Sequence, residues 1–182
     1  MAAICVFCAS SSTLDQQWLD LANQLGKALG PRGHTLVSGG GCVGMMGALA
    51  DGARASGAHT LGVIPQSLVD LEVADTRADE LIVTTDMGAR KNIMIERSDA
   101  FITLPGGLGT LDELFEVWTT ATLELHHKPI ILLDPAGFYD GLWSWLSGLA
   151  ETAFVRHAAL AQVTVVSSIE AALDTIEAAG GP

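Results

Sequence analysis

Short apolar runs alternate with amphipathic segments along the whole chain. Continuous apolar runs bounded by turn residues predict buried strands, whereas apolar positions three to four residues apart predict helices. On this basis we expect strands over residues 3–8, 34–38, 60–64, 80–83, 100–104, 130–133 and 163–166. We expect helices over residues 15–29, 44–55, 87–98, 111–125, 139–149 and 169–178.

This order of elements indicates the fold class. Strands that are apolar at every position, each followed by a helix, are typical of a parallel sheet covered on both faces. Because such crossovers are right-handed, the sequence predicts an α/β protein with a Rossmann-like, doubly wound parallel sheet and helices on both faces. No linker, internal repeat or shift in composition divides the chain, so residues 1–182 are expected to form a single domain.

A glycine-rich segment between a predicted strand and a predicted helix, Leu104–Glu113, reads LPGGLGTLDE. Glycines let the backbone approach a ligand, and the start of a helix offers free N–H groups, so the segment predicts a phosphate site. Thr110 and Glu113 have the spacing of a helix capping box. An acid beside a phosphate site suggests chemistry on a phosphorylated sugar. The alternative is a purely structural turn in which Glu113 only caps the helix.

A second glycine pattern raises the alternative of a dinucleotide site. Gly39, Gly41 and Gly44 match G-x-G-x-x-G, which in NAD-binding proteins is accompanied by an acidic residue at the end of the next strand. Here the next predicted strand ends in Pro65-Gln66-Ser67, and the pattern follows the second predicted strand rather than the first. Both features disfavour dinucleotide chemistry and leave close packing of helix on sheet as the alternative.

The charge of the chain excludes some partners. A net charge of −12 argues against nucleic-acid binding, which requires a basic face. No apolar stretch reaches the roughly 18 residues of a membrane span. The first residues lack the basic region of a signal peptide, so we expect a cytoplasmic protein. In so acidic a chain, the adjacent basic pair Arg90-Lys91 is a candidate anion contact, with a solvated helix face as the alternative.

The three cysteines do not suggest redox or metal chemistry. Cys5 and Cys8 form C-x-x-C, but they lie within a predicted strand, where residues three apart face opposite sides. An odd number of cysteines fits reduced thiols.

Four segments together resemble a known family. Residues 105–113 resemble the PGGxGTxxE signature of the Lonely Guy (LOG) proteins, and residues 87–91, with Met87 followed by Arg90-Lys91, resemble the family's second signature. Residues 38–47 resemble its GGGxxGLMG loop, and residues 6–11 its VFCGSS strand. The resemblance extends over nearly the whole chain.

The resemblance implies a Rossmann-like homodimer that needs neither metal nor cofactor. Its reaction would be hydrolysis of the N-glycosidic bond of adenine-type nucleoside 5'-monophosphates, such as AMP and N6-isopentenyl-AMP, to the free base and ribose 5-phosphate. The catalytic pair carries over to Arg90 and Glu113. Substrate contacts carry over to Glu72, Lys91, Gly107, Leu108, Gly109, Thr110, Leu111, Asp112 and Thr119.

Some positions differ from the family pattern. Asp112 stands where Glu is common, Cys42 replaces a typical Ser, and Gly88 takes a place often held by His. The residues around Glu72 lack the usual proline and basic residue. These differences leave the preferred base open, including the choice between AMP and nucleotides with a substituted adenine.

The residues suggest how such a reaction would proceed. Breaking the bond between ribose and base creates oxocarbenium-like charge, which a fixed carboxylate such as Glu113 stabilises. Arg90 would bind phosphate or sugar, or keep Glu113 ionised. Glu116 shares the helix face of Glu113 and either contacts the sugar or is an ordinary solvated residue. A separate stripe is predicted to be core, and it comprises Leu111, Leu114, Trp118 and Leu125.

Two other functions stay open at this point. A non-catalytic carrier of a nucleotide or cofactor on the same fold would need the phosphate site but not the acid. A lysine decarboxylase is disfavoured, because Lys91 has no evident apolar pocket that would lower its pKa. The helix over residues 87–98 carries apolar residues on more than one side, which predicts that it packs on a second chain beside the active site.

Overall fold

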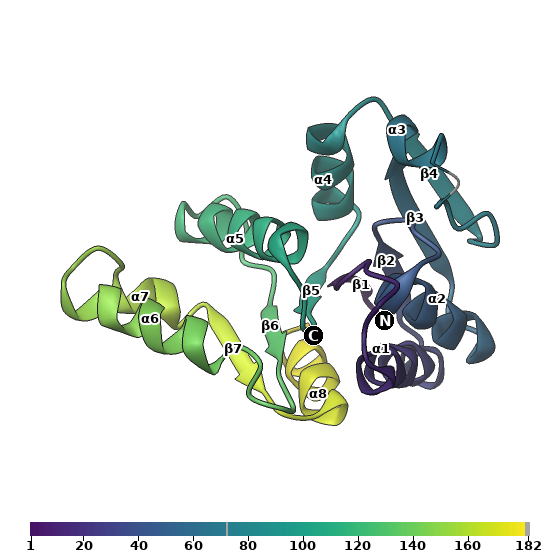
Figure 1. The fold of residues 1–182 in the computed structure, drawn as a ribbon. Coiled ribbons are helices and arrows are strands. Elements are labelled where there is room, and N and C mark those ends of the chain that lie inside the picture. The colour runs from purple at the N-terminus through teal and green to yellow at the C-terminus, as the bar shows by residue number, and fades with distance from the viewer. Residues whose placement is uncertain (72, 181–182) are drawn as a thin grey trace.

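The computed structural model describes residues 1–71 and 73–180 (Figure 1). Within them, seven strands form one parallel sheet with the order β4-β3-β2-β1-β5-β6-β7. The strands are β1 (Ala3–Phe7), β2 (Thr35–Ser38), β3 (Thr60–Pro65), β4 (Glu80–Thr84), β5 (Ala100–Thr103), β6 (Ile130–Leu133) and β7 (Val163–Val166). The predicted Rossmann-like parallel sheet is confirmed.

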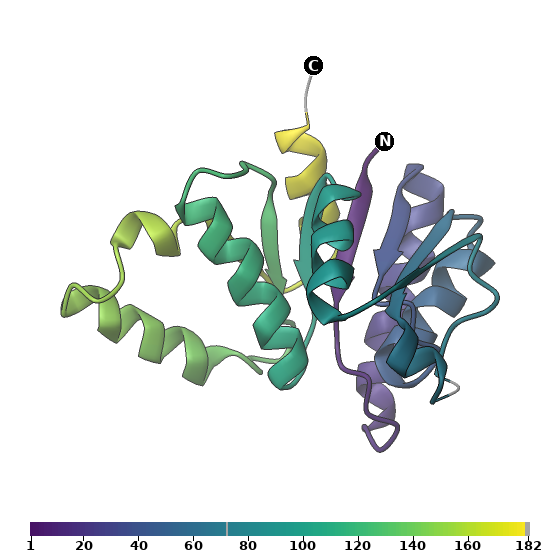
Figure 2. The ribbon, with the colours of Figure 1, turned by 90° about the horizontal axis from the view of Figure 1, so that it is seen from above.

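Helices cover both faces of the sheet (Figures 1 and 2). They are α1 (Gln16–Leu29), α2 (Gly44–Ala55), α3 (Gln66–Val69), α4 (Met87–Glu96), α5 (Leu108–Thr122), α6 (Asp140–Glu151), α7 (His157–Leu160) and α8 (Ile169–Ala179), with a 3-10 turn η1 (Gly30–Arg32) after α1. In Figure 1, α1, α2 and α8 lie on one side of the strands, and α4 and α5 lie on the other. None of the helices in the described residues is long and apolar enough to cross a membrane.

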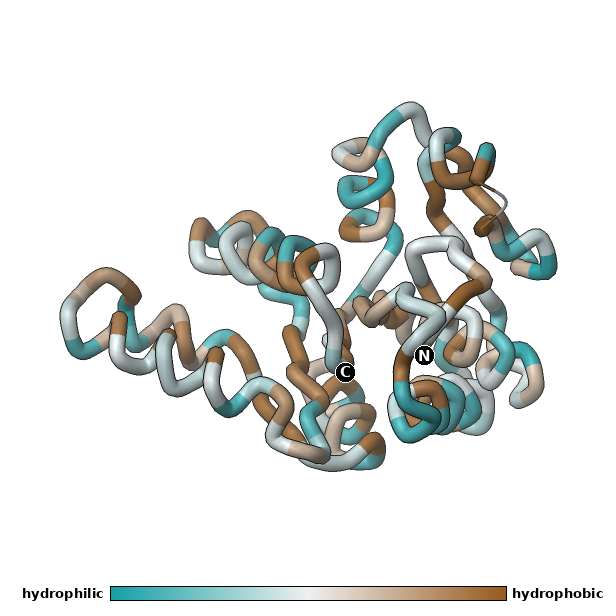
Figure 3. The backbone as a smooth tube through the Cα atoms, viewed as in Figure 1, coloured by the Kyte–Doolittle hydropathy of each residue, from teal (hydrophilic) through white to brown (hydrophobic). Residues whose placement is uncertain are grey.

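Each face of the sheet has its own apolar core. One core packs strand residues against α1, α2 and α8 through side chains such as Leu25 and Leu49. The other contains Phe101 and packs against α4 and α5. In Figure 3 the central strands are largely hydrophobic, which fits burial on both sides. Cys5 belongs to the second core and Cys8 to the first, which confirms that they face opposite sides as free thiols.

The order of the strands determines where a ligand can bind. From β1 the chain builds outward through β2, β3 and β4, and it then returns to place β5 on the other side of β1. The connections after β1 and β5 therefore diverge in opposite directions. In open parallel sheets, ligands bind in the crevice that such a reversal creates at the carboxyl ends of the strands.

Helix α5 differs from its predicted position. It begins at Leu108 rather than residue 111 and ends at Thr122 rather than residue 125, with Gly107 at its N-cap and no side-chain cap. The predicted capping box is wrong, because Thr110 already lies in the first helical turn and Glu113 turns toward Arg90 instead. Leu125 is exposed beyond the helix end, so the predicted core stripe comprises only its three earlier members.

Most of the large apolar residues of helix α4 pack against the core of the same chain. Asp86 caps it, since its carboxylate accepts a bond from the N–H of Ala89 at 2.9 Å. Met94 is buried, and Ile93 and Ile95 pack against the core of the same chain. Met87, in contrast, is 45% exposed, so the packing of α4 on a second chain stays a prediction.

Short helices α3 and α7 were not predicted from the sequence. Each contains four residues, which is about one turn and too short to show a helical repeat of apolar positions.

Candidate active site

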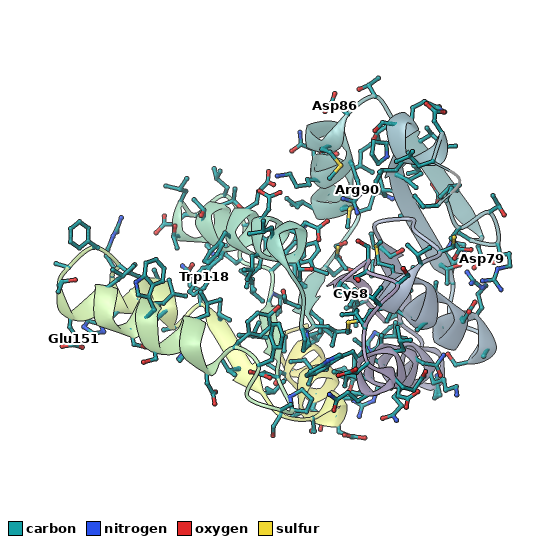
Figure 4. All side chains as sticks on the ribbon, viewed as in Figure 1. Cys8, Asp79, Asp86, Arg90, Trp118 and Glu151 are labelled. Carbon is teal, nitrogen blue, oxygen red and sulfur yellow. The ribbon has the colours of Figure 1, made fainter. Side chains whose placement is uncertain are left out.

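A cavity of about 550 Å³ opens at the carboxyl ends of the central strands, where the chain order reverses. The first turn of α5 borders it on one side, and the glycine loop after β2 borders it on another. Its lining residues are Val6, Cys8, Ala9, Ser10, Ser11, Gly39, Gly41, Val43, Met46, Ile64, Leu68, Leu71, Val73, Met87, Arg90, Gly107, Leu108, Gly109, Thr110 and Glu113. Figure 4 shows Arg90 beside α4, on the side toward Cys8.

The start of α5 is open toward this cavity. Gly107, Leu108 and Gly109 are exposed, and a side-chain atom added at Gly107 or Gly109 would meet nothing within 4 Å. Because no side chain caps the helix, its first N–H groups remain available to a ligand. Free N–H groups together with the positive end of the helix dipole favour an anion such as phosphate. Phosphate binding at this helix start stays a prediction.

Arg90 and Glu113 meet at the bottom of the cavity. Arg90 comes from α4 and Glu113 from α5, and their Nη1 and Oε1 atoms lie 3.1 Å apart. Both side chains are buried, with exposed fractions of 8% and 10%. The Nε of Arg90 also donates to the carbonyl oxygen of Val63 at 3.0 Å. The guanidinium is thus fixed by two elements besides its own helix.

The glycine loop leaves room for this guanidinium. A side-chain atom at Gly39 would collide with Nη2 of Arg90, so the absence of a side chain at this position lets the arginine lie across the loop. Gly40 has a φ of +69°, in the left-handed region that favours glycine. The first glycine of the GxGxxG pattern therefore leaves space for the side chain of Arg90.

Burial changes the acidity of the groups in the cavity. Burial raises the pKa of Glu113 from 4.5 to about 7, and the nearby charge of Arg90 lowers it only in part. A carboxyl with this pKa can accept and release a proton near neutrality. Burial and the charge of Glu113 also raise the pKa of Cys8 far above its usual range, which keeps the sulfur a thiol and makes it a poor nucleophile.

Lys91 lies outside the cavity and joins the two helices. Its Nζ is 2.9 Å from Oδ2 of Asp112 and 2.6 Å from Oε2 of Glu116, so it links α4 to α5. These two carboxylates raise the pKa of Lys91. Glu116 does lie on the Glu113 side of α5, as predicted, but it is paired with Lys91 rather than open to the cavity.

The structure thus brings together only part of the predicted site in one chain. The predicted residues that line the cavity are Arg90, Gly107, Leu108, Gly109, Thr110 and Glu113. Leu111 packs against the core, and Asp112 binds Lys91. Thr119 borders a different groove of about 330 Å³ beside Trp118. Glu72 lies outside the described residues. Substrate contacts by Glu72, Lys91, Leu111, Asp112 and Thr119 stay predictions.

Other residues that line the cavity could not be predicted from the sequence. Ile64, Leu68 and Val73 form an apolar wall at the end of β3 and in the segment that follows. They show no motif or periodicity, because one comes from a strand end, one from a single-turn helix and one from a loop. The backbone oxygen that binds Arg90 belongs to Val63, and backbone contacts of this kind leave no trace in residue type.

Known proteins resemble this chain over most of its length. Residues 46–176 match the sequence family described as "possible lysine decarboxylase". A Mycobacterium tuberculosis protein named cytokinin riboside 5'-monophosphate phosphoribohydrolase is 53% identical over 93% of this chain and 90% of its own. The chain belongs to the Lonely Guy family. A relative with the same name from Mycobacterium marinum is 51% identical over 93% of this chain and 90% of its own.

Solved structures that resemble this Lonely Guy protein include proteins that are described as cofactor-binding proteins. The molybdenum cofactor binding protein from the phototrophic bacterium Rippkaea orientalis superposes with a TM-score of 0.74 and 27% sequence identity. The alignment covers 100% of this chain and 99% of that one. The same fold is therefore found in a protein described by the cofactor that it binds.

Lys91, the lysine of the Lonely Guy signature in this chain, is unsuited to the lysine decarboxylase activity that the family description mentions. A lysine that forms a Schiff base needs a lowered pKa, and this requires an apolar pocket or a neighbouring cation without compensating acids. The pKa of Lys91 is instead raised by Asp112 and Glu116. Lys91 is thus held in its charged, unreactive form.

Proposed function

We propose that this protein is a hydrolase that cleaves the N-glycosidic bond of adenine-type nucleoside 5'-monophosphates to give the free base and ribose 5-phosphate. The observation that carries the proposal is the buried Arg90–Glu113 pair within the cavity that also holds the open start of α5. The names of the Mycobacterium relatives support the same reaction.

The proposed mechanism begins with the phosphate. Its oxygens accept bonds from the N–H groups of the first turn of α5, at Gly107–Thr110, and this holds the ribose within reach of Glu113. As the bond from ribose to base breaks, positive charge develops on the sugar. The ionised carboxylate of Glu113 stabilises that charge and orients a water molecule for attack on the sugar carbon. The water adds its hydroxyl group to the sugar carbon as the bond to the base breaks, and its other proton goes to the departing base, which gives ribose 5-phosphate and the neutral base.

Arg90 has a supporting part in this mechanism. Its charge lowers the pKa of Glu113 against the effect of burial, and so maintains a fraction of ionised carboxylate near neutral pH. Its guanidinium also borders the cavity, where it can bind a sugar or phosphate oxygen.

The base would lie against the apolar wall of Ile64, Leu68, Val73 and Met87. A flat, weakly polar adenine suits such a wall, and so does an adenine that carries an alkyl group on N6. We therefore propose that both AMP and N6-isopentenyl-AMP are substrates.

A carrier function is the second candidate, because the Rippkaea orientalis cofactor-binding protein shares the fold over the whole chain. A carrier needs the phosphate site but gains nothing from a buried carboxylate with a pKa near neutrality. The decisive experiment is to incubate the protein with AMP and with N6-isopentenyl-AMP, and to measure free base and ribose 5-phosphate by chromatography. We expect both products from both nucleotides. Binding of the nucleotides without release of base would favour the carrier.

We also propose that the protein forms a homodimer. The groove beside Thr119 is bordered by Phe154, which is 83% exposed, and Leu123 and Leu125 are exposed near the end of α5. Large apolar side chains gathered on one side of a protein favour contact with another chain. This surface lies on α5 and the α6–α7 segment, and not on α4 as the sequence suggested.

A further inference from the structure

The loop between β6 and α6 is held rigidly although it lies outside the cavity. It starts at Asp134, a buried residue directly after β6. Oδ1 of Asp134 accepts a bond from the N–H of Phe138, and Oδ2 accepts one from the N–H of Tyr139, each at 2.8 Å. Between them, Gly137 has a φ of +70°, which lets the loop turn back on itself. The backbone at Tyr139 is therefore fixed.

Tyr139 connects this loop to the phosphate turn. Its side chain is 3% exposed, and its hydroxyl donates to the carbonyl oxygen of Leu104 at 2.8 Å, 35 residues away in the sequence. The N–H of Gly106 lies near the same phenolic oxygen and partly opposes the effect of burial, which still raises the pKa of Tyr139 above its usual range. The hydroxyl thus remains protonated and available as a donor.

Leu104 and Gly106 are the residues on either side of Pro105, where the chain leaves β5 and turns toward α5. The far side of this turn is packed as well, because a side-chain atom at Gly106 would collide with the side chain of Thr110. On the near side, the N–H of Leu104 donates to the carbonyl oxygen of Phe7 at 2.9 Å. The hydroxyl of Tyr139 adds a further contact, from a residue that does not line the cavity.

We propose that Tyr139 is a positioning residue, which sets the turn at Leu104–Gly107 so that the first N–H groups of α5 point at the 5'-phosphate; this rests on the proposed function. Removing the hydroxyl leaves the carbonyl of Leu104 buried without its donor, and a backbone group in that state moves to find another partner. A small movement of the turn misaligns the N–H groups with the phosphate oxygens. The apolar wall proposed for the base lies on other elements, and Glu113 lies further along α5 and is paired with Arg90 of α4, so these parts of the site are not affected.

The test uses Tyr139→Phe, which removes only the hydroxyl. The control is Ser98→Ala, because Ser98 is also buried and its hydroxyl donates to a backbone oxygen, that of Met94 at 2.7 Å, away from the turn. Titration calorimetry with the two products, ribose 5-phosphate and adenine, measures the phosphate and base parts of the site separately. Neither product is consumed during the titration. Thermal unfolding of each variant is measured in parallel.

We expect Tyr139→Phe to weaken binding of ribose 5-phosphate by about tenfold, the effect of about one lost or misaligned hydrogen bond to a charged group. Binding of adenine stays within about twofold of the parent, and Ser98→Ala leaves both affinities unchanged. With AMP as substrate, KM rises in Tyr139→Phe while kcat at saturation changes little.

Two results would overturn this role for Tyr139: unchanged affinity for ribose 5-phosphate, or equal weakening of both products. If Tyr139→Phe does not fold, Asp134→Asn is used instead, because it removes one acceptor for the loop and keeps the tyrosine. A smaller but still selective loss for ribose 5-phosphate is then expected, and a loss for both ligands would refute the proposal. Should the parent fail to hydrolyse AMP, the proposed function fails, and the same comparison is made with AMP and adenosine as ligands.

Discussion

Glu113 illustrates at the scale of one residue how packing creates a reactive group. Its sequence position in the first turns of α5 allows a solvated carboxylate, a cap or a catalytic acid. Burial raises its pKa to about 7, and Arg90 at 3.1 Å limits that rise. The pair is placed by α4, α5 and the carbonyl of Val63 together. The reactivity therefore belongs to the arrangement of the three elements.

Replacing this carboxylate tests its role directly. We expect Glu113→Gln to lower kcat/KM for AMP by roughly 10²- to 10⁴-fold, the usual range for a group that acts on a proton or on developing charge. Binding of AMP, measured by calorimetry, should remain within a few-fold, because the phosphate contacts are unchanged. Glu116→Gln is the control on the next turn of the same helix, where little loss is expected. Near-parental turnover by Glu113→Gln would show that this side chain is only structural.

The raised pKa of Glu113 predicts how activity depends on pH. If the ionised carboxylate is the active form, kcat/KM for AMP rises with pH and levels off above a midpoint near 7. The profile is measured between pH 5 and pH 9 under conditions where the protein remains folded. A flat profile across the midpoint would mean that another group limits the reaction.

The free energy of unfolding should fall as pH rises, whereas kcat/KM should rise. The pKa of Glu113 is about 7 in the folded protein and close to 4.5 when unfolded, so the folded state binds more protons between these values. The free energy of unfolding therefore decreases as pH rises through this window, by about 3 kcal/mol, and stays level above it. In Glu113→Gln this component of the pH dependence is absent. Urea titrations of parent and variant at pH 5 and pH 8 measure the difference.

At the scale of elements, α4 and α5 form one functional unit. Arg90 pairs with Glu113 at the cavity, and Lys91 beside it pairs with Asp112 and Glu116, so two adjacent cations of α4 bind three different acids of α5. The sequence shows the adjacent cations, but only the packing of the helices shows that they have different partners. A shift of α4 along its axis would disturb both pairs.

The cap of α4 offers a test of this unit. Asp86→Ala removes the bond from the carboxylate to the N–H of Ala89, and Ser168→Ala removes the matching cap of α8 on the opposite face of the sheet. We expect both variants to lose thermal stability, because each leaves a helix start without its cap. Only Asp86→Ala should also lower kcat/KM for AMP, by roughly threefold, because it loosens the helix that carries Arg90. Equal activity of the two variants would separate the start of α4 from catalysis.

At the scale of the whole molecule, the reversal of strand order decides where the chemistry takes place. The loops after β1, β2 and β5 come from distant parts of the sequence and meet at one edge of the sheet. The α5–α7 side carries exposed apolar residues and a second groove. Under the two proposals the ends of α5 have different tasks, with the phosphate at its start and a second chain near its end.

Light scattering after gel filtration tests the proposed dimer. A dimer has twice the chain mass of 19.0 kDa, and we expect this mass at micromolar concentration. Phe154→Asp places a charge on the exposed apolar surface and should shift the protein toward a monomer. Gln24→Asp, at an exposed position of α1 on the other face of the sheet, is the control and should leave the mass unchanged. A monomeric parent that hydrolyses AMP would refute the dimer.

The sequence by itself determined the order and type of the main elements. The predicted bounds of α2, β6 and β7 match the structure, because apolar spacing and glycine or proline breaks are local features that directly reflect burial. The predicted start of α5 lies three residues too late, because Leu108 and Gly109 stand within a glycine-rich run that resembles a loop in sequence. The likeness of the motifs to a family also pointed to Arg90 and Glu113.

Only the tertiary structure decided what these residues do to one another. The pairing of Arg90 with Glu113, the pKa that results from it, the two acids that hold Lys91 and the contact of Tyr139 with Leu104 all join segments far apart in the chain. Their physical reason is the same in each case. Charge and hydrogen bonding act over a few ångströms, and which groups come that close, and how far water is removed from them, is settled by the packing of whole helices on the sheet.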